Sequence, residues 1–180
     1  MPCDDSDGHD AMLVRRTLDG SGAAFTGLFE RYYARIRAHA YRMVLDVHLA
    51  DDVAQETFIR AASNLACLRE TEAFAAWIFR IAGNIAKDKL RSQTAYAARL
   101  EAFANDPCEP SSPATAETVE TARIHAAIRK LPPKQREAVS LVWFENNTHA
   151  EAAGVLGCAE STVSWRLALA KRQLRKLLAP

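Results

Sequence analysis

The chain has 180 residues, of which 49% are hydrophobic and 25% are charged, and its formal net charge is +1. This length allows one globular domain or two small ones, and the near-neutral charge excludes binding of nucleic acid through overall basicity. No apolar run approaches the roughly 20 residues that span a bilayer, and the acidic residues 1–5 are unlike a signal peptide. We therefore expect a cytoplasmic protein without membrane insertion.

The charges and the cysteines are unevenly placed. The segment from Glu160 to the C-terminus holds five Lys or Arg residues and one acid, whereas residues 100–122 hold five acids and no base. This asymmetry predicts an anionic partner for the C-terminal segment. The four cysteines form no Cys-x-x-Cys pair, so we expect free thiols, no metal site and no cofactor.

The N-terminal residues 1–19 are interpreted as a tail. Residues 1–10 hold four Asp residues with Gly and Ser, a composition that predicts disorder, and residues 13–18 predict a short helix that ends at Gly20. From residue 23 to residue 45, apolar side chains recur every three or four positions. This period predicts a long amphipathic helix.

A second helix is predicted over residues 50–65, with Asp51 or Asp52 as its N-cap. The positions expected to face the core are Val53, Phe58, Ala61, Ala62 and Leu65. The positions expected to face solvent are Asp52, Gln55, Glu56 and Arg60. An acid/base or metal cluster of these acids with His48 is an alternative, but a capped surface helix accounts for the same residues without chemistry.

A third helix is predicted from Phe74 to Arg91, with a possible extension over the alanine-rich residues 92–104. Its core side is expected to hold Trp77, Ile78, Ile81, Ile85 and Leu90. The other side is polar and mostly basic: Arg80, Asn84, Lys87, Asp88 and Arg91. Aromatic rings beside basic residues are typical of proteins that bind single strands, although Trp77 and Phe79 fit a plain core equally, and for Trp77 we favour the core.

Residues 96–121 are interpreted as a flexible linker, because residues 105–117 combine Pro, Ser and acids without apolar periodicity. The predicted fold class is therefore all-α, with one small helical domain over residues 20–95 and another over residues 122–180.

The C-terminal domain contains a helix-turn-helix pattern. A helix beginning near Pro132 is followed by a short helix from Thr148, a turn at Gly157 and a longer helix from Glu160 to Leu178. The longer helix has a core stripe of Val163, Leu167, Ala170, Leu174 and Leu177. Its other face is small and polar at first and cationic later, which suits base edges and then phosphates, although a solvated face would look similar.

These segments resemble regions 2 and 4 of the bacterial sigma-70 factors, and most closely the small extracytoplasmic-function (ECF) class. The region 4 motifs are Leu131-Pro132, Gln135-Arg136, Glu151, Gly157, Thr162-Val163, Arg166-Leu167 and Lys171-Arg172. The region 2 motifs are Ala24-Phe25, Arg31-Tyr32-Tyr33, the acidic run of residues 52–58, and residues 77–84 from Trp77 to Asn84.

The resemblance implies a promoter-specificity subunit of RNA polymerase, with core polymerase and promoter DNA as partners and an anti-sigma factor as a possible third. It implies minus-thirty-five DNA contacts by Ser161, Thr162, Ser164, Trp165, Arg166, Lys171, Arg172 and Arg175. It implies capture of melted minus-ten DNA near the loop 66–73 and by Phe74, Arg80, Asn84 and Lys87. It implies polymerase binding by Asp52, Gln55 and Glu56.

The sequence departs from the family pattern at two places. Ser164 and Leu169 stand where the family often has Arg or Lys, which leaves the base contacts open. Ala61-Ala62 stands where the family usually has Ala-Trp, so the packing under that helix must differ.

Two other classes of function are compatible with parts of the sequence. A stand-alone helix-turn-helix regulator would bind duplex DNA without polymerase, but it has no reason to carry residues 52–58 and 77–84. A protein that only sequesters another factor would not need the basic C-terminal helix. The sequence offers no nucleophile–base pair, phosphate loop or metal set, so we do not expect an enzyme.

Overall fold

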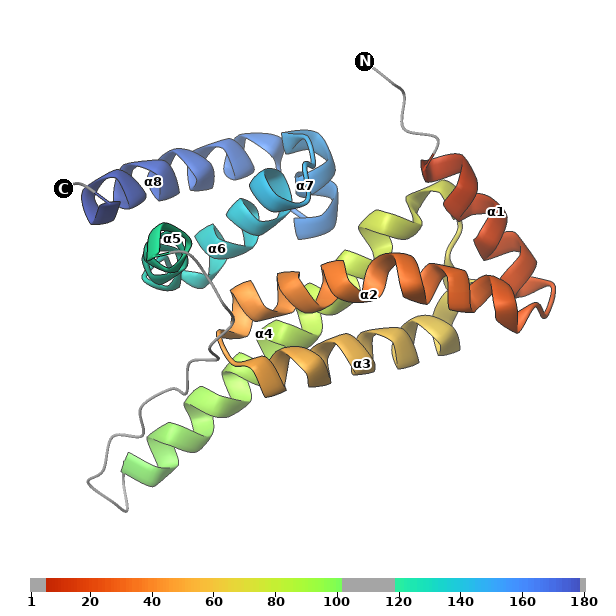
Figure 1. Cartoon of the computed structure of the whole chain (residues 1–180), viewed down its shortest axis with the longest axis horizontal. Helices are drawn as coiled ribbons and strands as arrows, with labels where there is room; N and C mark the ends of the chain where they lie inside the picture. Colours follow the sequence, from red (N-terminus) through yellow and green to blue (C-terminus); the bar gives the residue numbers. More distant parts are fainter. Residues whose placement is uncertain (1–5, 102–118, 179–180) are drawn as a thin grey trace.

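The computed structural model describes residues 6–101 and 119–178, and these fold into helices without a strand (Figure 1). The predicted all-α class is confirmed. The α-helices of the N-terminal half are α1 (Ser6–Leu18), α2 (Gly22–Val44), α3 (Val47–Asn64) and α4 (Phe74–Glu101). Short 3₁₀ turns at Leu65–Cys67 and Thr71–Ala73 lie between α3 and α4. The C-terminal half holds α5 (Val119–Arg129), α6 (Pro133–Val139), the π-helical turn η3 (Ser140–Phe144), α7 (His149–Leu156) and α8 (Glu160–Leu178).

Local capping explains where α2 and α3 begin and end. The Ser21 hydroxyl accepts a hydrogen bond from the Ala24 amide at the start of α2, and Leu45 ends the helix with φ at 64°. Asp46 then caps α3 by accepting from the Leu49 amide at 2.8 Å. The predicted N-cap at Asp51 or Asp52 is wrong, because the helix begins at Val47.

The N-terminal helix α1 is part of the core. The predicted disorder of residues 1–10 is wrong from Ser6 onward, while residues 1–5 lie outside the described part of the chain. Val14 is fully buried, and the buried Asp10 carboxylate accepts a hydrogen bond from the Tyr32 hydroxyl of α2. Burial, reinforced by Asp10, raises the pKa of that tyrosine.

The N-terminal half is a bundle of α1 to α4, in which α4 crosses α2 and its C-terminal part extends beyond the other helices (Figure 1). The predicted extension of this helix is confirmed to Glu101. Of the predicted linker of residues 96–121, residues 96–101 belong to α4 and residues 119–121 to α5, whereas residues 102–118 lie outside the described residues. On α3, Ala62 is exposed and not inward as predicted.

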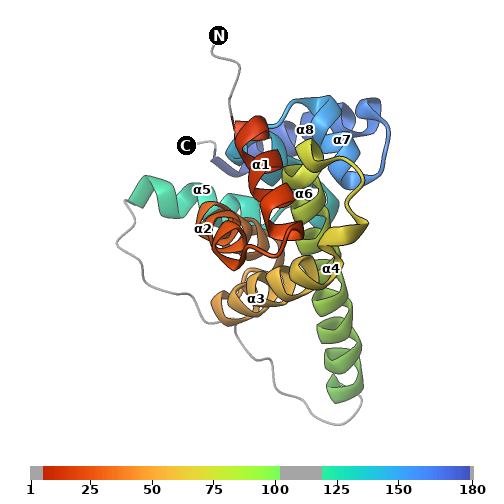
Figure 2. The ribbon, with the colours of Figure 1, turned by 90° about the vertical axis from the view of Figure 1, so that its right-hand side faces the viewer.

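The two halves pack against each other. One hydrophobic core contains buried side chains of α1 to α4 together with those of α6, α7 and α8, among them Ala138, Val139, Leu141 and Val163. Helix α6 packs against α2 and α7 against α4, and α8 lies on α6 and α7, farther from the bundle (Figure 1 and Figure 2). The sequence predicted two tethered modules and gave no sign of this contact.

Candidate DNA and polymerase interfaces

The helix-turn-helix is formed as the sequence predicts. Thr148 caps α7 in a reciprocal arrangement, since its hydroxyl accepts from the Glu151 amide at 3.2 Å and the Glu151 carboxylate accepts from the Thr148 amide at 2.6 Å. Gly157 ends α7 with φ at 62°, a left-handed conformation that disfavours side chains with a Cβ. These two caps fix where α7 begins and ends, and Gly157 forms the turn that leads into α8.

The predicted core stripe of α8 is buried over its first half. Val163, Leu167 and Ala170 are buried, Leu174 is half-buried, and Leu177 is 37% exposed. The stripe therefore fixes the N-terminal part of the helix most firmly, which is the part that a helix-turn-helix protein presents to base edges.

The predicted minus-thirty-five residues fall into two groups. The exposed ones are Ser161, Trp165, Lys171, Arg172 and Arg175. The half-buried ones are Thr162, Ser164 and Arg166. Within the second group, the Ser164 hydroxyl forms a 2.9 Å hydrogen bond with Nδ1 of His149 on α7, so it helps to join the two helices.

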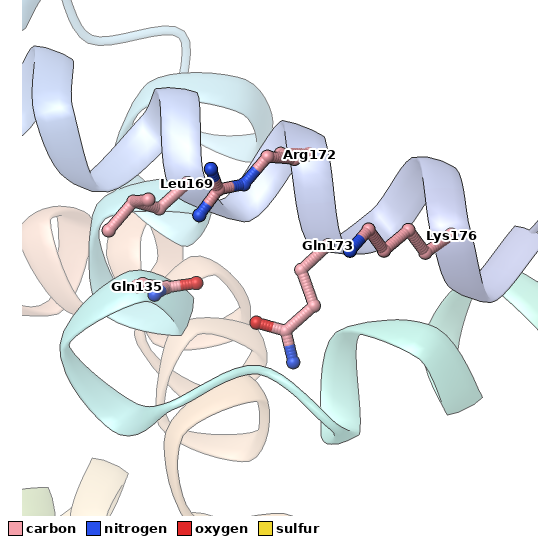
Figure 3. A pocket seen from close by; sticks show the side chains of 5 residues that line it. All are labelled: Gln135, Leu169, Arg172, Gln173 and Lys176. Carbon is pink, nitrogen blue, oxygen red and sulfur yellow. The ribbon is translucent and has the colours of Figure 1, made fainter.

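A shallow cavity of about 310 Å³ lies between α6 and α8. Figure 3 shows Arg172 and Lys176 of α8 beside it, with Gln135 of α6 opposite and Gln173 nearby. Gln173 donates a hydrogen bond to the Lys130 carbonyl at 3.1 Å, which ties α8 to the segment before α6. Two cations, Arg172 and Lys176, therefore lie beside this cavity in the C-terminal half of α8.

The predicted polymerase-binding residues lie on the outer face of α3. Asp52 and Gln55 are exposed, whereas Glu56 forms ion pairs with Arg60 at 2.6 Å and with Lys89 of α4 at 3.3 Å. Ile59, a large aliphatic residue on the same helix, is 67% exposed.

The predicted minus-ten residues of α4 lie in different surroundings. Phe74 is fully buried against Tyr32 and Trp77. Its ring therefore cannot stack on a base in this arrangement. Arg80 donates to the Gly154 carbonyl of α7 at 2.9 Å. The Lys87 ammonium lies 2.8 Å from the Glu137 carboxylate of α6. Asn84 is exposed.

The aromatic residues of α4 favour the plain-core interpretation. Phe79 is buried, and Trp77 is half-buried against the main core.

The loop before α4, which was predicted to lie near the melted strand, is in contact with α1. Arg15 of α1 donates a hydrogen bond to Glu72 at 2.7 Å and to Thr71 at 3.3 Å. The sequence reading did not connect α1 with this loop.

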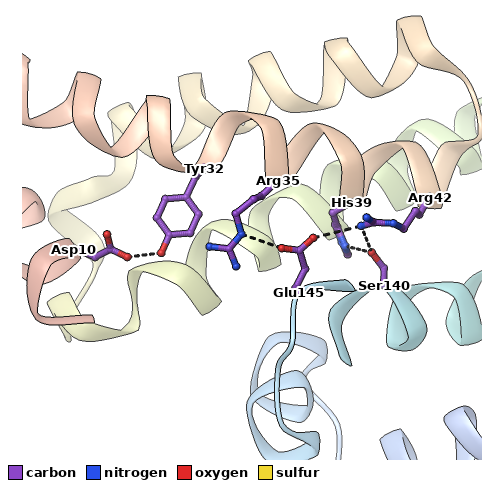
Figure 4. A network of polar contacts seen from close by, with 7 residues as sticks. All are labelled: Asp10, Tyr32, Arg35, His39, Arg42, Ser140 and Glu145. Carbon is purple, nitrogen blue, oxygen red and sulfur yellow. Dashed lines mark hydrogen bonds and ion pairs between the residues drawn. The ribbon is translucent and has the colours of Figure 1, made fainter. Parts of the chain in front are cut away.

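A polar network joins α2 to the segment between α6 and α7 (Figure 4). The buried Glu145 carboxylate binds Arg35 at 3.0 Å and Arg42 at 3.3 Å. Nδ1 of His39 lies 2.9 Å from the Ser140 hydroxyl, which also accepts from Arg42 at 3.2 Å. Burial, with the nearby charges of Arg42 and Lys87, lowers the pKa of His39 to about 3, so the imidazole is neutral here.

A second buried carboxylate, that of Glu137, points from α6 toward α4. Burial raises its pKa, and the Lys87 ammonium opposes this rise. Arg166 of α8 contributes a weaker opposing charge. At Lys87, the α4 face predicted to bind DNA is therefore covered by α6 in this arrangement, whereas Arg80 and Asn84 stay exposed.

Across the described ranges 6–101 and 119–178, no three His, Cys, Asp or Glu side chains come together in a geometry that could hold a metal ion. In the same ranges, no helix is both long and apolar enough to cross a membrane.

Comparison with known families identifies both halves. The family models for Sigma-70 region 2 and Sigma-70, region 4 match residues 28–96 and 121–174. The RNA polymerase sigma-H factor of Pseudomonas aeruginosa is 33% identical over 95% of this chain and 94% of its own length. The chain belongs to the sigma-70 family. It is thus a promoter-specificity subunit, which directs core RNA polymerase to promoter DNA.

Other relatives of this sigma factor place it in the ECF class. The ECF RNA polymerase sigma factor SigM of Mycobacterium tuberculosis is 33% identical over 94% of this chain and 84% of its own length. SigW of Bacillus subtilis, also named an ECF factor, is 30% identical over 92% of this chain and 94% of its own length.

Solved structures share the fold of the sigma factor. CnrH, in complex with the cytosolic domain of CnrY, is 28% identical with a TM-score of 0.73 over 94% of this chain and 97% of its own. RpoE of Bartonella quintana, in complex with the anti-sigma factor NepR, also has a TM-score of 0.73, over 86% of this chain and 96% of its own. Its identity of 23% supports the fold alone.

Proposed function

We propose that three surfaces of this sigma factor divide the work of promoter recognition. The outer face of α3 binds core polymerase, α8 reads the minus-thirty-five element, and the polar face of α4 holds one strand of the melted minus-ten element. The observation that carries the proposal is α8, a helix-turn-helix recognition helix whose exposed face changes from small polar residues to cations.

On α8, base contact is assigned to the first turns and phosphate contact to the last. Ser161 and Trp165 are exposed at the N-terminal end, with Thr162, Ser164 and Arg166 at the edges of that face. Serine hydroxyls discriminate poorly between bases, so Arg166 and DNA shape are expected to supply specificity. Lys171, Arg172 and Arg175 are exposed farther along and are assigned to the backbone.

On α4, Arg80, Asn84 and Lys87 recur at four and three residues, so they lie on one face of the helix. A melted strand needs both neutralised phosphates and a surface that keeps its bases apart from the partner strand. Because Arg80 and Lys87 are engaged by α7 and α6, we infer that the two halves separate before this face binds DNA.

On α3, the polymerase-binding surface consists of Asp52, Gln55 and Glu56, to which we add Ile59. An apolar side chain surrounded by charged ones is typical of a protein interface, because it combines burial with charge complementarity. The two structural relatives CnrH and RpoE are bound to CnrY and to the anti-sigma factor NepR, and we propose that this chain too has an anti-sigma partner. We place its activity in the cytoplasm and assign no catalytic step to it.

The experiment is an electrophoretic shift of genomic promoter fragments with the full chain, with core polymerase, and with both. We expect sequence-specific complexes only when both are present. Specific complexes formed by the chain alone, unaffected by core, would instead support a stand-alone regulator. A matched pair of variants, Asp52→Lys and Arg172→Ala, should lose the ternary complex for different reasons, the first through core binding and the second through DNA binding.

A further inference from the structure

The polar face of α4 contains a glycine, Gly83, in the middle of the helix, where alanine would be more stabilising. Gly83 lies between Arg80 and Lys87 on α4 and is buried. Glycine in the middle of a helix costs about 1 kcal/mol relative to alanine, so a packing reason is needed for its presence. The space that a side chain would take is occupied by Glu137, because a Cβ at position 83 would lie 2.9 Å from Oε1 of that carboxylate.

The seat for Glu137 has the features of an oxyanion site. The carboxylate approaches the backbone of α4 through the gap at Gly83, and Lys87, one turn farther along, pairs with the same Oε1 at 2.8 Å. Arg80 lies one turn earlier on the helix and donates to the Gly154 carbonyl. The helix therefore presents a cation, a gap and a second cation in succession along one face.

A phosphodiester oxygen and a carboxylate oxygen make the same demands on this seat. Both are anionic acceptors that pair with an ammonium at about 2.8 Å. Both also need close access, which the missing Cβ of Gly83 provides. The two anions cannot be present together, because Glu137 is 4% exposed and fills the gap.

We propose that Glu137 is a surrogate for a promoter phosphate. In the arrangement described here, its carboxylate fills the seat at Gly83 and Lys87, and a backbone phosphate of the melted minus-ten strand takes the same seat when α6 moves away. The Glu137 carboxylate thereby competes with the DNA phosphate for the same site on α4. This inference rests on the proposed binding of the minus-ten strand by α4.

The test uses the full chain and a fluorescein-labelled single-stranded DNA of 20 nucleotides and mixed sequence, titrated at several salt concentrations. Glu137→Gln keeps the shape of the side chain and removes the competing charge. We expect binding to tighten about tenfold and the salt slope to rise by about 0.7, as one more phosphate contact forms. Glu145→Gln is the matched control for loosening, since it removes a buried carboxylate from the same junction but leaves the Glu137 charge beside Lys87 wherever the halves stay packed.

Two further variants separate competition from mere loosening. In a Lys87→Gln background, the gain of Glu137→Gln should fall to that of Glu145→Gln. Gly83→Ala should shift the Glu137 carboxylate, because the new Cβ would lie 2.9 Å from its Oε1. It should not tighten DNA binding, because the same methyl group obstructs a phosphate. Circular dichroism melting of every variant verifies that the fold is retained.

Three results would overturn the proposal: equal gains for Glu137→Gln and Glu145→Gln, a gain that persists without Lys87, or a gain in Gly83→Ala that matches Glu137→Gln. Asn84→Ala distinguishes failure of the surrogate role of Glu137 from failure of minus-ten binding by α4. If it weakens strand binding while Glu137→Gln brings no gain, only the surrogate is overturned. If neither variant changes strand binding, the minus-ten assignment of α4 is overturned as well.

Discussion

Arg166 and Arg172 lie on the same helix but in different surroundings. Arg172 is exposed at the cavity with Lys176, whereas Arg166 is half-buried and close enough to Glu137 to affect its carboxylate. Arg172→Ala should therefore weaken binding to all duplex sequences alike and lower the salt slope by about 0.9. Arg166→Ala should relax preference at one base pair, at a cost of about 1–3 kcal/mol. A minus-thirty-five library titrated at two salt concentrations with the polymerase complex measures both effects.

The Arg166 prediction has a clear alternative. If Arg166→Ala leaves sequence preference intact but lowers the melting temperature, the residue is an internal strut beside Glu137. Base reading would then fall to Ser161, Ser164 and Trp165.

His39 makes the stability of the protein depend on pH. Its pKa is about 3 in the folded chain and near 6.5 when exposed, so below pH 6.5 the unfolded chain binds a proton that the folded chain does not. Stability contributed by His39 is complete above pH 6.5 and falls by about 1.4 kcal/mol per pH unit below it. Glu137, whose pKa is raised by burial, acts in the opposite direction above its ordinary value of 4.5.

The His39 contribution is isolated by comparing the wild-type chain with His39→Asn, which is neutral at every pH. We expect the difference in unfolding free energy between the two to shrink as the pH falls from 7 to 5 in urea titrations. A difference that stays constant over this range would show that His39 titrates normally.

At the scale of single helices, α3 offers the sharpest test of polymerase binding. Glu56 is engaged with Arg60 and Lys89, so reversing its charge also disturbs the packing of α3 on α4. Asp52 is exposed and suits the purpose better. Asp52→Lys should weaken core binding at least tenfold, while the free energy of unfolding stays within about 0.5 kcal/mol of the wild-type value. Surface plasmon resonance with immobilised core, together with thermal melting, gives both values, and unchanged core affinity would remove α3 from the interface.

The helices also show what the sequence could and could not predict. Gly157, the Thr148–Glu151 cap and the period of α8 are local signals, and they placed the helix-turn-helix correctly. The start of α3 was misplaced because two later aspartates competed with Asp46 as caps. Helix α1 was partly missed because the Ser, Asp and Gly residues of its first turn hide a short apolar stripe that includes Ala11 and Val14.

The junction between the halves had no sequence signal. Nothing in the sequence marks Glu137 or Glu145 as buried, because their buried position depends on cations from distant helices. Arg35, for example, binds Glu145 across a separation of 110 residues. Two of the proposed α4 contacts, Arg80 and Lys87, were predicted as exposed, but their partners in the C-terminal half became visible only with the fold.

At the scale of the whole molecule, buried ion pairs hold the halves together. Removing one partner of such a pair costs about 3–5 kcal/mol, because the other charge stays buried without compensation. Glu145→Gln leaves the largely buried Arg42 in that position, while Arg35, whose side chain is 41% exposed, stays in contact with solvent, so we expect the halves to separate in a measurable fraction of molecules. Small-angle X-ray scattering should then give a larger radius of gyration than for the wild-type chain, with Arg91→Gln as the surface control. An unchanged radius would mean that the apolar core alone holds the halves together.

Run-off transcription shows whether this chain gives core RNA polymerase its choice of promoter. Core polymerase is incubated with genomic fragments, with and without the full chain, and the start sites are mapped. We predict start sites that appear only with the chain and share a minus-thirty-five and a minus-ten element, and that are lost with Asp52→Lys and with Arg172→Ala. Transcripts that are the same with and without the chain would mean that it does not select promoters for core polymerase.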